Sequence, residues 1–183
     1  MVKNSNLLIN YDADALDMAS SKIGDCTYVL DWWKYSGLEL KYSIFSLYYP
    51  SLNGHINILE WWKNSGLELK YSQNALMAAS QCNRLNVFDW WKNSGLELKY
   101  SVNLLYYASK DGLIDVLKWW FNSGLPLKYD ESVFIIAREN GHYNIIQFLK
   151  ESGLFQCNES TSTSISISTF GYRRQLYENQ HIN

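Results

Sequence analysis

The sequence has few cysteines, and no two of them lie close together along the chain. They are Cys26, Cys82 and Cys157, and no C-x-x-C pair occurs. Isolated cysteines in odd number favour neither a disulfide framework nor a zinc site. Reduced thiols of this kind are typical of intracellular proteins, so we expect an intracellular, cytoplasmic location.

Long apolar runs are also missing. The first residues of the chain lack the apolar core of a secretory signal. No stretch approaches the roughly 18 consecutive apolar residues that a membrane-spanning helix needs. We therefore expect no membrane partner.

The chain has no excess of charge of one sign. It carries 16 basic and 18 acidic side chains, which gives a net charge of −2. Proteins that bind the phosphate backbone of nucleic acids usually gather positive charge for that purpose. The composition therefore argues against a nucleic-acid partner unless a local patch supplies one.

What the sequence does contain is an internal repeat. The segment Trp61–Ser72 recurs unchanged at Trp90–Ser101, Trp32–Ser43 differs from it only at Tyr35, and Trp119–Asp130 is a looser copy. The loop glycines of successive copies are 29 residues apart, at Gly37, Gly66, Gly95, Gly124 and Gly153. A period of this length predicts a stack of small structural units, each resting on its neighbours.

Each copy predicts a pair of short helices. We expect the first helix to be capped by the polar residue before its helix-forming run, which is Asp14, Asn74, Asn103 or Ser132. The second helix follows Gly54, Asn83, Gly112 or Gly141. One copy departs, because it has Phe45 at the capping position and Pro50 inside the helix. We expect its first helix to be short or distorted.

The tryptophan pairs are expected to belong to the core. In one copy Ile58, Leu59, Trp61 and Trp62 lie at helical spacing and form one wide apolar arc. Trp62 lies near the centre of this arc and Trp61 at its edge. On the opposite face Glu60 is expected to pair with Lys63.

These residues together resemble the ankyrin repeat. Asn74–Ser80 matches the start of the family pattern, Asn53–Trp62 matches its second helix, and Ala137–Ile146 is the copy most similar to it. The double-Trp form resembles the tandem arrays of giant DNA viruses, which amoebal and fungal proteins also contain. The resemblance implies an all-α solenoid of helix–turn–helix units that binds proteins. Since the family's unit has 33 residues and this one 29, it also implies truncated hairpins between units.

The repeat sets the expected domain boundaries. Residues 1–157 are predicted to form one array of about five units, with the first and last atypical, and with negligible strand. Residues 158–183, which include a run of Ser, Thr and Ile, are predicted to be a disordered tail.

No catalytic or metal-binding set is apparent. His55 and His142 follow the turn between helices and lie three repeats apart, so they cannot share a metal ion. We expect each to make a local hydrogen bond at the start of its helix. No phosphate-binding loop occurs, and no serine or cysteine has a histidine base by spacing. The sequence therefore predicts neither a cofactor nor an enzyme.

Two columns of the repeat have alternative interpretations. The lysines Lys41, Lys70, Lys99 and Lys128 could form a track for phosphate groups, although glutamates two residues away offset much of their charge. The tyrosines Tyr11, Tyr42, Tyr71, Tyr100 and Tyr129 are expected to pack between units.

The most variable column lies along the first helices. It contains the candidate partner-binding residues Tyr48, Met77, Gln81, Tyr106 and Lys110, and it begins at Asp17 and Ser21. In the ankyrin resemblance this face lines the concave groove. Variation here is consistent with partner binding and equally with drift on an unconstrained surface.

Three functional hypotheses follow. The first is a protein-interaction scaffold without catalytic activity, whose protein partner, possibly a host protein, the sequence does not identify. The second is binding of nucleic acid or another anionic surface through the lysine column. The third is a degenerate array copy with no partner. The oligomeric state cannot be read from the sequence.

Overall fold

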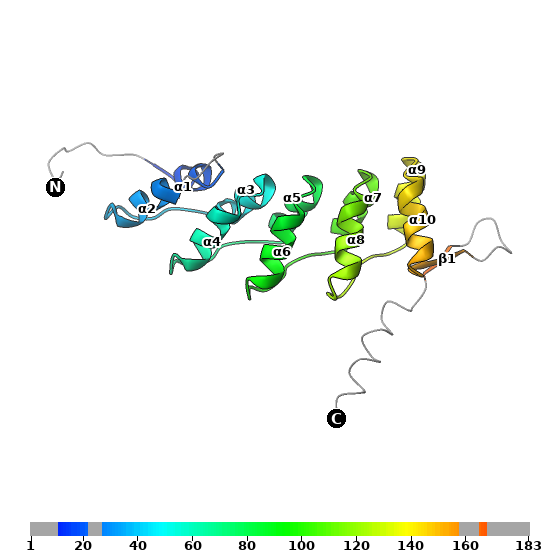
Figure 1. Cartoon of the computed structure of the whole chain (residues 1–183). Helices are drawn as coiled ribbons and strands as arrows, with labels where there is room; N and C mark the ends of the chain where they lie inside the picture. The colour runs from blue at the N-terminus through cyan, green and yellow to red at the C-terminus, as the bar shows by residue number, and fades with distance from the viewer. Residues whose placement is uncertain (1–10, 22–26, 158–164, 168–183) are drawn as a thin grey trace, which may run out of the picture. The chain divides into compact units, whose positions relative to one another are not determined.

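The computed structural model describes residues 11–21, 27–157 and 165–167, with side chains as far as Leu154. The described chain is helical apart from two short strands (Figure 1). The helices are α1 (Asp14–Ala19), α2 (Thr27–Tyr35), α3 (Phe45–Asn53), α4 (Ile56–Asn64), α5 (Asn74–Gln81), α6 (Leu85–Asn93), α7 (Asn103–Lys110), α8 (Ile114–Asn122), α9 (Ser132–Glu139) and α10 (Tyr143–Glu151). The all-α prediction is confirmed for these residues.

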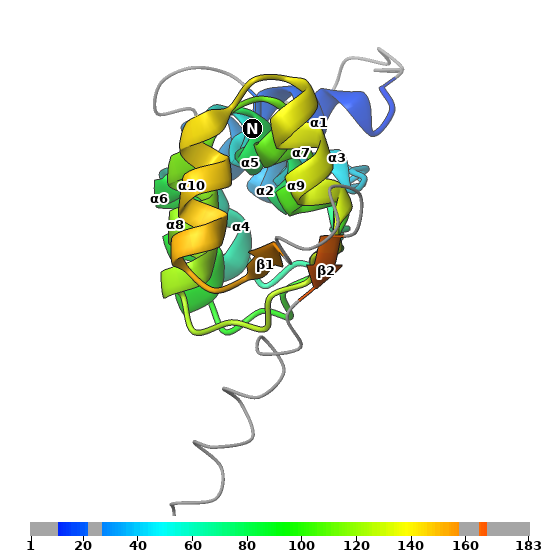
Figure 2. The same ribbon diagram turned by 90° about the vertical axis from the view of Figure 1, so that its right-hand side faces the viewer.

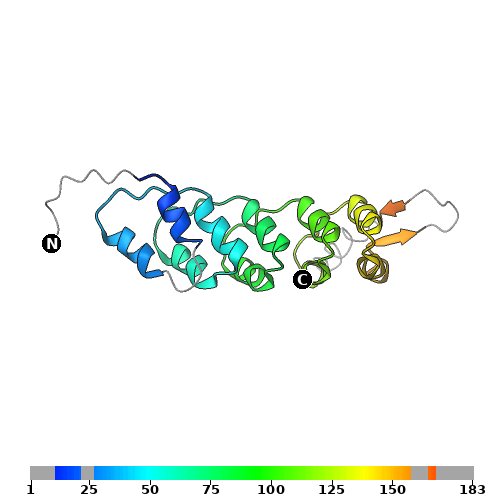
Figure 3. The ribbon, with the colours of Figure 1, turned by 90° about the horizontal axis from the view of Figure 1, so that it is seen from above.

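The chain divides into two compact units. Unit 1 comprises residues 1–79 and 86–98, and unit 2 comprises residues 80–85 and 99–183. In unit 1, α1 contacts α2 and α3 contacts α4, while α1 also lies beside α3 and α2 beside α4 (Figure 3). In unit 2, α7 contacts α8, α9 contacts α10, and α7 lies beside α9. Within each unit, therefore, helix pairs contact the next pair along the chain.

Four of the five first helices, α1, α3, α5 and α9, are capped by residues other than those predicted. Their first backbone N–H groups donate to side chains two positions earlier, as in Asp14 to Asp12 at 3.0 Å, Phe45 to Ser43 at 3.2 Å and Asn74 to Ser72 at 3.3 Å. In α9, Ser132 likewise donates to Asp130 at 2.9 Å. The caps thus lie in the connecting loop, and Asp14, Asn74 and Ser132 are already helical.

The first helix around Pro50 was predicted to be short or distorted, and it is not short. Helix α3 has 9 residues, more than any of the other four first helices, and Pro50 lies inside it and is buried. The backbone N–H groups of Gly54 and His55 both donate to the Pro50 carbonyl, at 2.9 Å each. These bonds close the last turn on Gly54, whose φ of 81° ends the helix. The loop cap at Ser43 also removes the need for a polar residue at Phe45.

The buried side chains of the second helices come from the predicted apolar arc. Trp62, Trp91 and Trp120 are 0%, 1% and 2% exposed and are the largest buried groups among the described residues. The first tryptophan of each pair, such as Trp61, is partly buried, as expected for the edge of the arc. The first copy departs from this, because Trp32 is 57% exposed.

A short two-stranded sheet follows the last helix. Strand β1 (Phe155–Cys157) pairs antiparallel with β2 (Ile165–Ile167), and β1 contacts α10 (Figure 2). The segment of β2 was expected to lack regular structure. Its alternation of Ile and Ser has the two-residue period of a strand, which accounts for the difference. The rest of the predicted tail, 158–164 and 168–183, lies outside the described residues, as do Cys26 and the side chain of Cys157.

Candidate interaction surface

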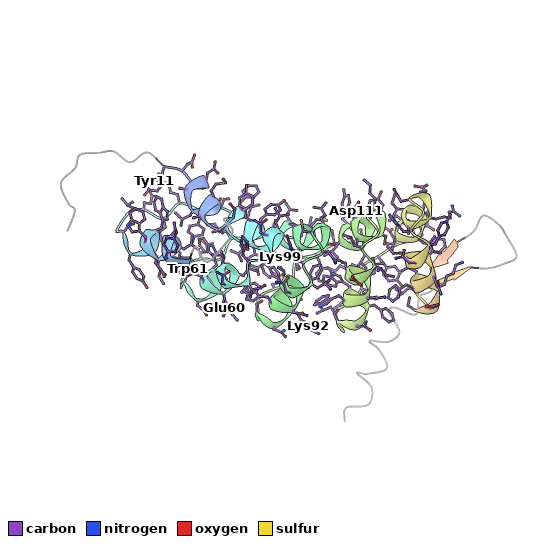
Figure 4. All side chains as sticks on the ribbon, turned by 45° about the horizontal axis from the view of Figure 1, so that its top comes forward. Tyr11, Glu60, Trp61, Lys92, Lys99 and Asp111 are labelled. Carbon is purple, nitrogen blue, oxygen red and sulfur yellow. The ribbon has the colours of Figure 1, made fainter. Side chains whose placement is uncertain are left out.

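The second helices of unit 1 are joined by hydrogen bonds from tryptophan to acidic side chains. The Nε1–H of Trp61 in α4 donates to Asp31 in α2 at 2.7 Å, and that of Trp90 in α6 donates to Glu60 in α4 at 2.8 Å. In Figure 4, Trp61 lies on the side of α4 that faces α2. The bonds from Trp90 and then Asn64 lower the pKa of Glu60. Glu60 therefore serves mainly as an acceptor for the next repeat, and Lys63 contributes less than predicted.

The buried tryptophans Trp62 and Trp91 donate hydrogen bonds to serines in or just after the first helix of the preceding copy. Trp62 Nε1 donates to Ser20 Oγ at 2.9 Å, and Trp91 Nε1 donates to Ser51 Oγ at 3.1 Å. In the last copy Leu149 replaces the tryptophan, and the buried Ser109 hydroxyl has no hydrogen-bond partner among the described residues. The buried Ser80 hydroxyl of unit 2 also lacks a hydrogen-bond partner there, so in the described part of the chain the tryptophan–serine bond is found at the two sites of unit 1 only.

The tyrosine column packs between successive copies, as predicted. The Tyr42 ring lies 4.9 Å from Trp62, and its hydroxyl donates to the Glu68 carbonyl at 2.9 Å. Tyr71 contacts Trp91 and the Glu97 carbonyl in the same way. Tyr100 lies 4.5 Å from Trp120 and donates to the Pro126 carbonyl at 2.7 Å, and Tyr11 contacts Trp33 and the Glu39 carbonyl. Each tyrosine fastens one loop to the next copy.

The lysine column packs on these tyrosines. Lys70 Nζ lies 4.5 Å from the centre of the Tyr42 ring and donates to the Tyr42 carbonyl at 3.3 Å. Lys128 makes the same pair of contacts with Tyr100, at 4.4 Å and 3.0 Å. Lys41 lies over Tyr11 at 5.1 Å and pairs with Glu39 at 3.7 Å. These three ammonium groups therefore take part in contacts within the repeat array, and those of Lys70 and Lys128 join successive copies.

His142 also bonds across copies, so the predicted local bond is wrong for this residue. Its Nε2 lies 2.9 Å from the Lys110 carbonyl at the end of α7. The ring rests against Gly112, where an added Cβ would approach it to 2.7 Å. The glycine therefore leaves room for an imidazole that joins two helix pairs of unit 2.

The candidate partner-binding residues lie on the first helices and are at least partly accessible. Tyr48 on α3, Met77 on α5 and Tyr106 on α7 are partly exposed, whereas Gln81 and Lys110 are exposed. Met77 and Gln81 are one turn apart on α5, as are Tyr106 and Lys110 on α7.

Aromatic contacts order part of this surface. Tyr48 makes edge-to-face contacts with Phe45 at 5.5 Å and Tyr49 at 5.4 Å. Tyr106 makes one with Tyr107 at 5.3 Å. Phe45 is also 42% exposed and contacts Tyr48, although its sequence position indicated only a poor helix cap. Met18 on α1 is 52% exposed and had no distinguishing signal in the sequence.

Asp17 does not belong to the exposed surface, although it begins the variable column. It is only 1% exposed, and its carboxylate accepts from the backbone N–H of Ser43 at 3.1 Å and 3.2 Å and from the Ser43 hydroxyl. This long-range bond explains the burial of a charged residue. The variable surface in unit 1 therefore lies on the later helices.

The described residues were found to hold neither a metal-ligand cluster nor a membrane-spanning helix. No group of three or more His, Cys, Asp or Glu is placed to hold a metal ion in the described part of the chain. None of the helices within these ranges is long and apolar enough to cross a bilayer. Cys82 is a free, exposed thiol.

Comparison with protein-family models finds no match for the chain. Comparison with curated proteins finds none either.

Proposed function

We propose that this protein is an intracellular, ankyrin-type interaction scaffold of about five units, without catalytic activity, which binds a protein through the face of its first helices. The observation that carries the proposal is that invariant and variable residues of the repeat make different contacts. The invariant residues contact neighbouring copies, whereas the variable ones, apart from Asp17, retain accessible surface.

The contacts of the invariant loop support this difference between invariant and variable residues. Tyr42 and Lys70 hold two successive loops together in unit 1, and Tyr100 and Lys128 do so in unit 2. The loops between copies contain no strand among the described residues, which agrees with truncated hairpins. Since such loops project little, the first-helix face is the surface left for a partner.

The chemistry of the variable residues also favours a protein partner. Tyr48 and Tyr106 present partly exposed aromatic rings, and Lys110 presents an exposed cation. Tyrosine is enriched at binding hot spots because its ring supplies a large contact area and its hydroxyl a hydrogen bond.

Binding of an anionic surface is the alternative, and the lysine contacts count against it. A phosphate would have to compete with tyrosine faces and backbone carbonyls for Lys70 and Lys128. Salt-dependent retention on heparin that requires these lysines would favour the alternative.

The proposal is tested by capture of a partner from the cell that produces the protein. The variant Tyr106→Ala/Lys110→Ala should lose the captured protein while its thermal unfolding stays nearly unchanged, because substitutions of accessible residues usually change stability by about 0.5 kcal/mol or less. Tyr143→Ala/Lys150→Ala removes the same two residue types from exposed positions of α10 and should bind fully. Equal capture by both variants would refute the first-helix face.

A further inference from the structure

The outer face of α2 carries three exposed aromatic side chains. Tyr28, Trp32 and Tyr35 are 69%, 57% and 76% exposed. Their spacing of four and then three residues places them on one side of the helix. An aromatic stripe of this kind is unusual on a surface that contacts only water.

On later second helices the position of Trp32 is partly covered, whereas the positions of Tyr28 and Tyr35 hold exposed asparagines, Asn57 and Asn64 in α4. Trp61 stands at the position of Trp32 and donates to Asp31 of α2, and Trp90 donates to Glu60 of α4. Both tryptophans are partly buried. In the described part of the chain no helix supplies such an acceptor to Trp32.

The residues that flank Trp32 depart from the internal copies. Tyr28 and Tyr35 replace the asparagines found at Asn57 and Asn64 in α4. In α4 the Asn64 amide donates to Glu60 of its own helix at 2.8 Å. Both departures on α2 extend the aromatic surface around Trp32, and both are of a type enriched at protein interfaces.

We propose that this face docks an amphipathic helix of a partner protein that presents a carboxylate to the Trp32 Nε1–H. The chain's own interfaces specify the carboxylate, since Asp31 and Glu60 are the two acceptors that receive this indole group in unit 1. A hydrogen bond from an indole N–H to a carboxylate is charge-assisted, and it strengthens as the interface loses water. Residues beside the carboxylate should be apolar, because they face Tyr28 and Tyr35.

A second copy of the chain fits this description poorly. Its last second helix, α10, carries Gln147 at the position of Asp31 and Glu60. The Gln147 amide donates to Glu151 at 2.7 Å. At the equivalent position of α10, a second copy would therefore offer Trp32 a neutral amide oxygen.

The test uses a labelled synthetic peptide of residues Ile44–Ser72, a complete 29-residue copy that carries Glu60. Fluorescence anisotropy should show saturable binding to the full chain. Trp32→Phe, which keeps an aromatic ring and removes the indole N–H, should weaken binding roughly tenfold or more, as should Glu60→Lys in the peptide. Tyr143→Ala, which removes an equally exposed aromatic from α10, should leave binding unchanged.

A tethered form removes dependence on the folding of the free peptide. The same 29 residues are inserted between Tyr11 and Asp12, and the rest of the chain is kept. The insertion raises their effective concentration beside α2. This tethered form should melt at a higher temperature than the chain alone, and Trp32→Phe should abolish most of the gain. The proposal is overturned if neither form depends on Trp32. It is also overturned if sedimentation shows self-association that Trp32→Ala abolishes, because the occupant would then be a second copy and not a partner protein.

Discussion

Neighbouring tryptophans of one helix have different surroundings. Trp62 is fully buried, its indole N–H bonds to Ser20, and Tyr42 packs on its ring. Trp61 is partly buried, and its N–H reaches Asp31 at an exposed site. The difference follows from the helical angle of about 100° between consecutive residues, which turns one side chain inward and the next toward the edge.

Truncation should therefore cost different amounts at these two positions. Trp62→Ala should lower the free energy of unfolding by about 3–5 kcal/mol, the usual range for a buried large aromatic. Trp61→Ala should cost clearly less, because part of its ring is already in water and its hydrogen bond is exposed. Urea titrations of both variants measure the two losses. Equal losses of less than 1 kcal/mol would contradict the burial of Trp62.

Gly112 and Gly141 form a matched pair for a second experiment at the residue scale. Both have left-handed backbone, with φ of 75° and 73°. A Cβ at Gly141 meets nothing within 4 Å, whereas one at Gly112 meets the His142 ring at 2.7 Å. Gly141→Ala should cost about 1 kcal/mol from backbone strain. Gly112→Ala should cost about 1 kcal/mol more, because the imidazole must move and lose its bond to the Lys110 carbonyl.

Denaturant titration distinguishes the two glycine variants. His142→Ala combined with Gly112→Ala supplies the control, since the additional cost of the alanine at position 112 should vanish once the ring is absent. If Gly112→Ala and Gly141→Ala lose the same stability, the contact with His142 has no energetic consequence.

At the scale of elements, tyrosines hold the connecting loops in place. Their burial makes ionisation of the hydroxyl less favourable. Burial raises the pKa of Tyr42, Tyr71, Tyr100 and Tyr129, and the nearby Glu68 and Glu97 carboxylates raise it further for Tyr42 and Tyr71. A raised pKa in the folded state means that the neutral tyrosine stabilises the fold. This contribution is complete below the ordinary tyrosine pKa of about 10 and is lost as pH rises through the folded-state value.

Stability should accordingly fall in alkaline solution, beginning near pH 10. Replacing Tyr42, Tyr71 and Tyr100 by Phe should lower stability at neutral pH, because the hydroxyls lose their bonds to backbone carbonyls. The same variant should lose less stability than the wild type between pH 9 and about 11.5. Thermal melts across this range test the prediction, with Tyr143→Phe at an exposed site as the control. An identical alkaline decline in wild type and triple variant would contradict it.

Sequence patterns predicted the helices well because the same pattern occurs in each copy of the repeat. Each tryptophan pair with its following glycine marked the end of a second helix, and α4, α6 and α8 end at the expected place. Helix starts were harder to place, since two polar residues stand near each one and only the path of the loop decides which accepts the N–H. Asn74 was predicted to cap its helix and α3 was predicted to lack a polar cap, whereas Ser72 and Ser43 accept the first N–H groups of α5 and α3.

Contacts between copies could not be predicted from one copy. The burial of Asp17 depends on Ser43 in the next loop, and the role of Glu60 depends on Trp90 in the next second helix. The candidate binding residues were chosen because they vary, and their accessibility agrees with that choice without testing it. Exposed surface on α2 escaped notice because Trp32 belongs to a segment that is otherwise invariant.

At the scale of the whole molecule, the lysine column separates the two functional classes. A net charge of −2 gives no general attraction for polyanions, so such binding would depend on local lysines. Lys70 and Lys128 instead lie over tyrosine rings and donate to backbone carbonyls. A cation in this position contributes about 0.5–1 kcal/mol at an exposed site.

The two interpretations predict opposite results for Lys70→Met/Lys128→Met. If the lysines are structural, the variant should lose about 1–2 kcal/mol of stability in urea titrations, the sum of two such contacts, and its weak retention on heparin should not change. If they form an anionic-surface site, stability should hardly change, and the salt needed for elution from heparin should fall because fewer counterions are released on binding. Lys118→Met, at an exposed position of α8, controls for the loss of a positive charge as such. We expect the first result, because an ammonium group placed between a ring and a carbonyl has already exchanged much of its hydration for contacts within the protein.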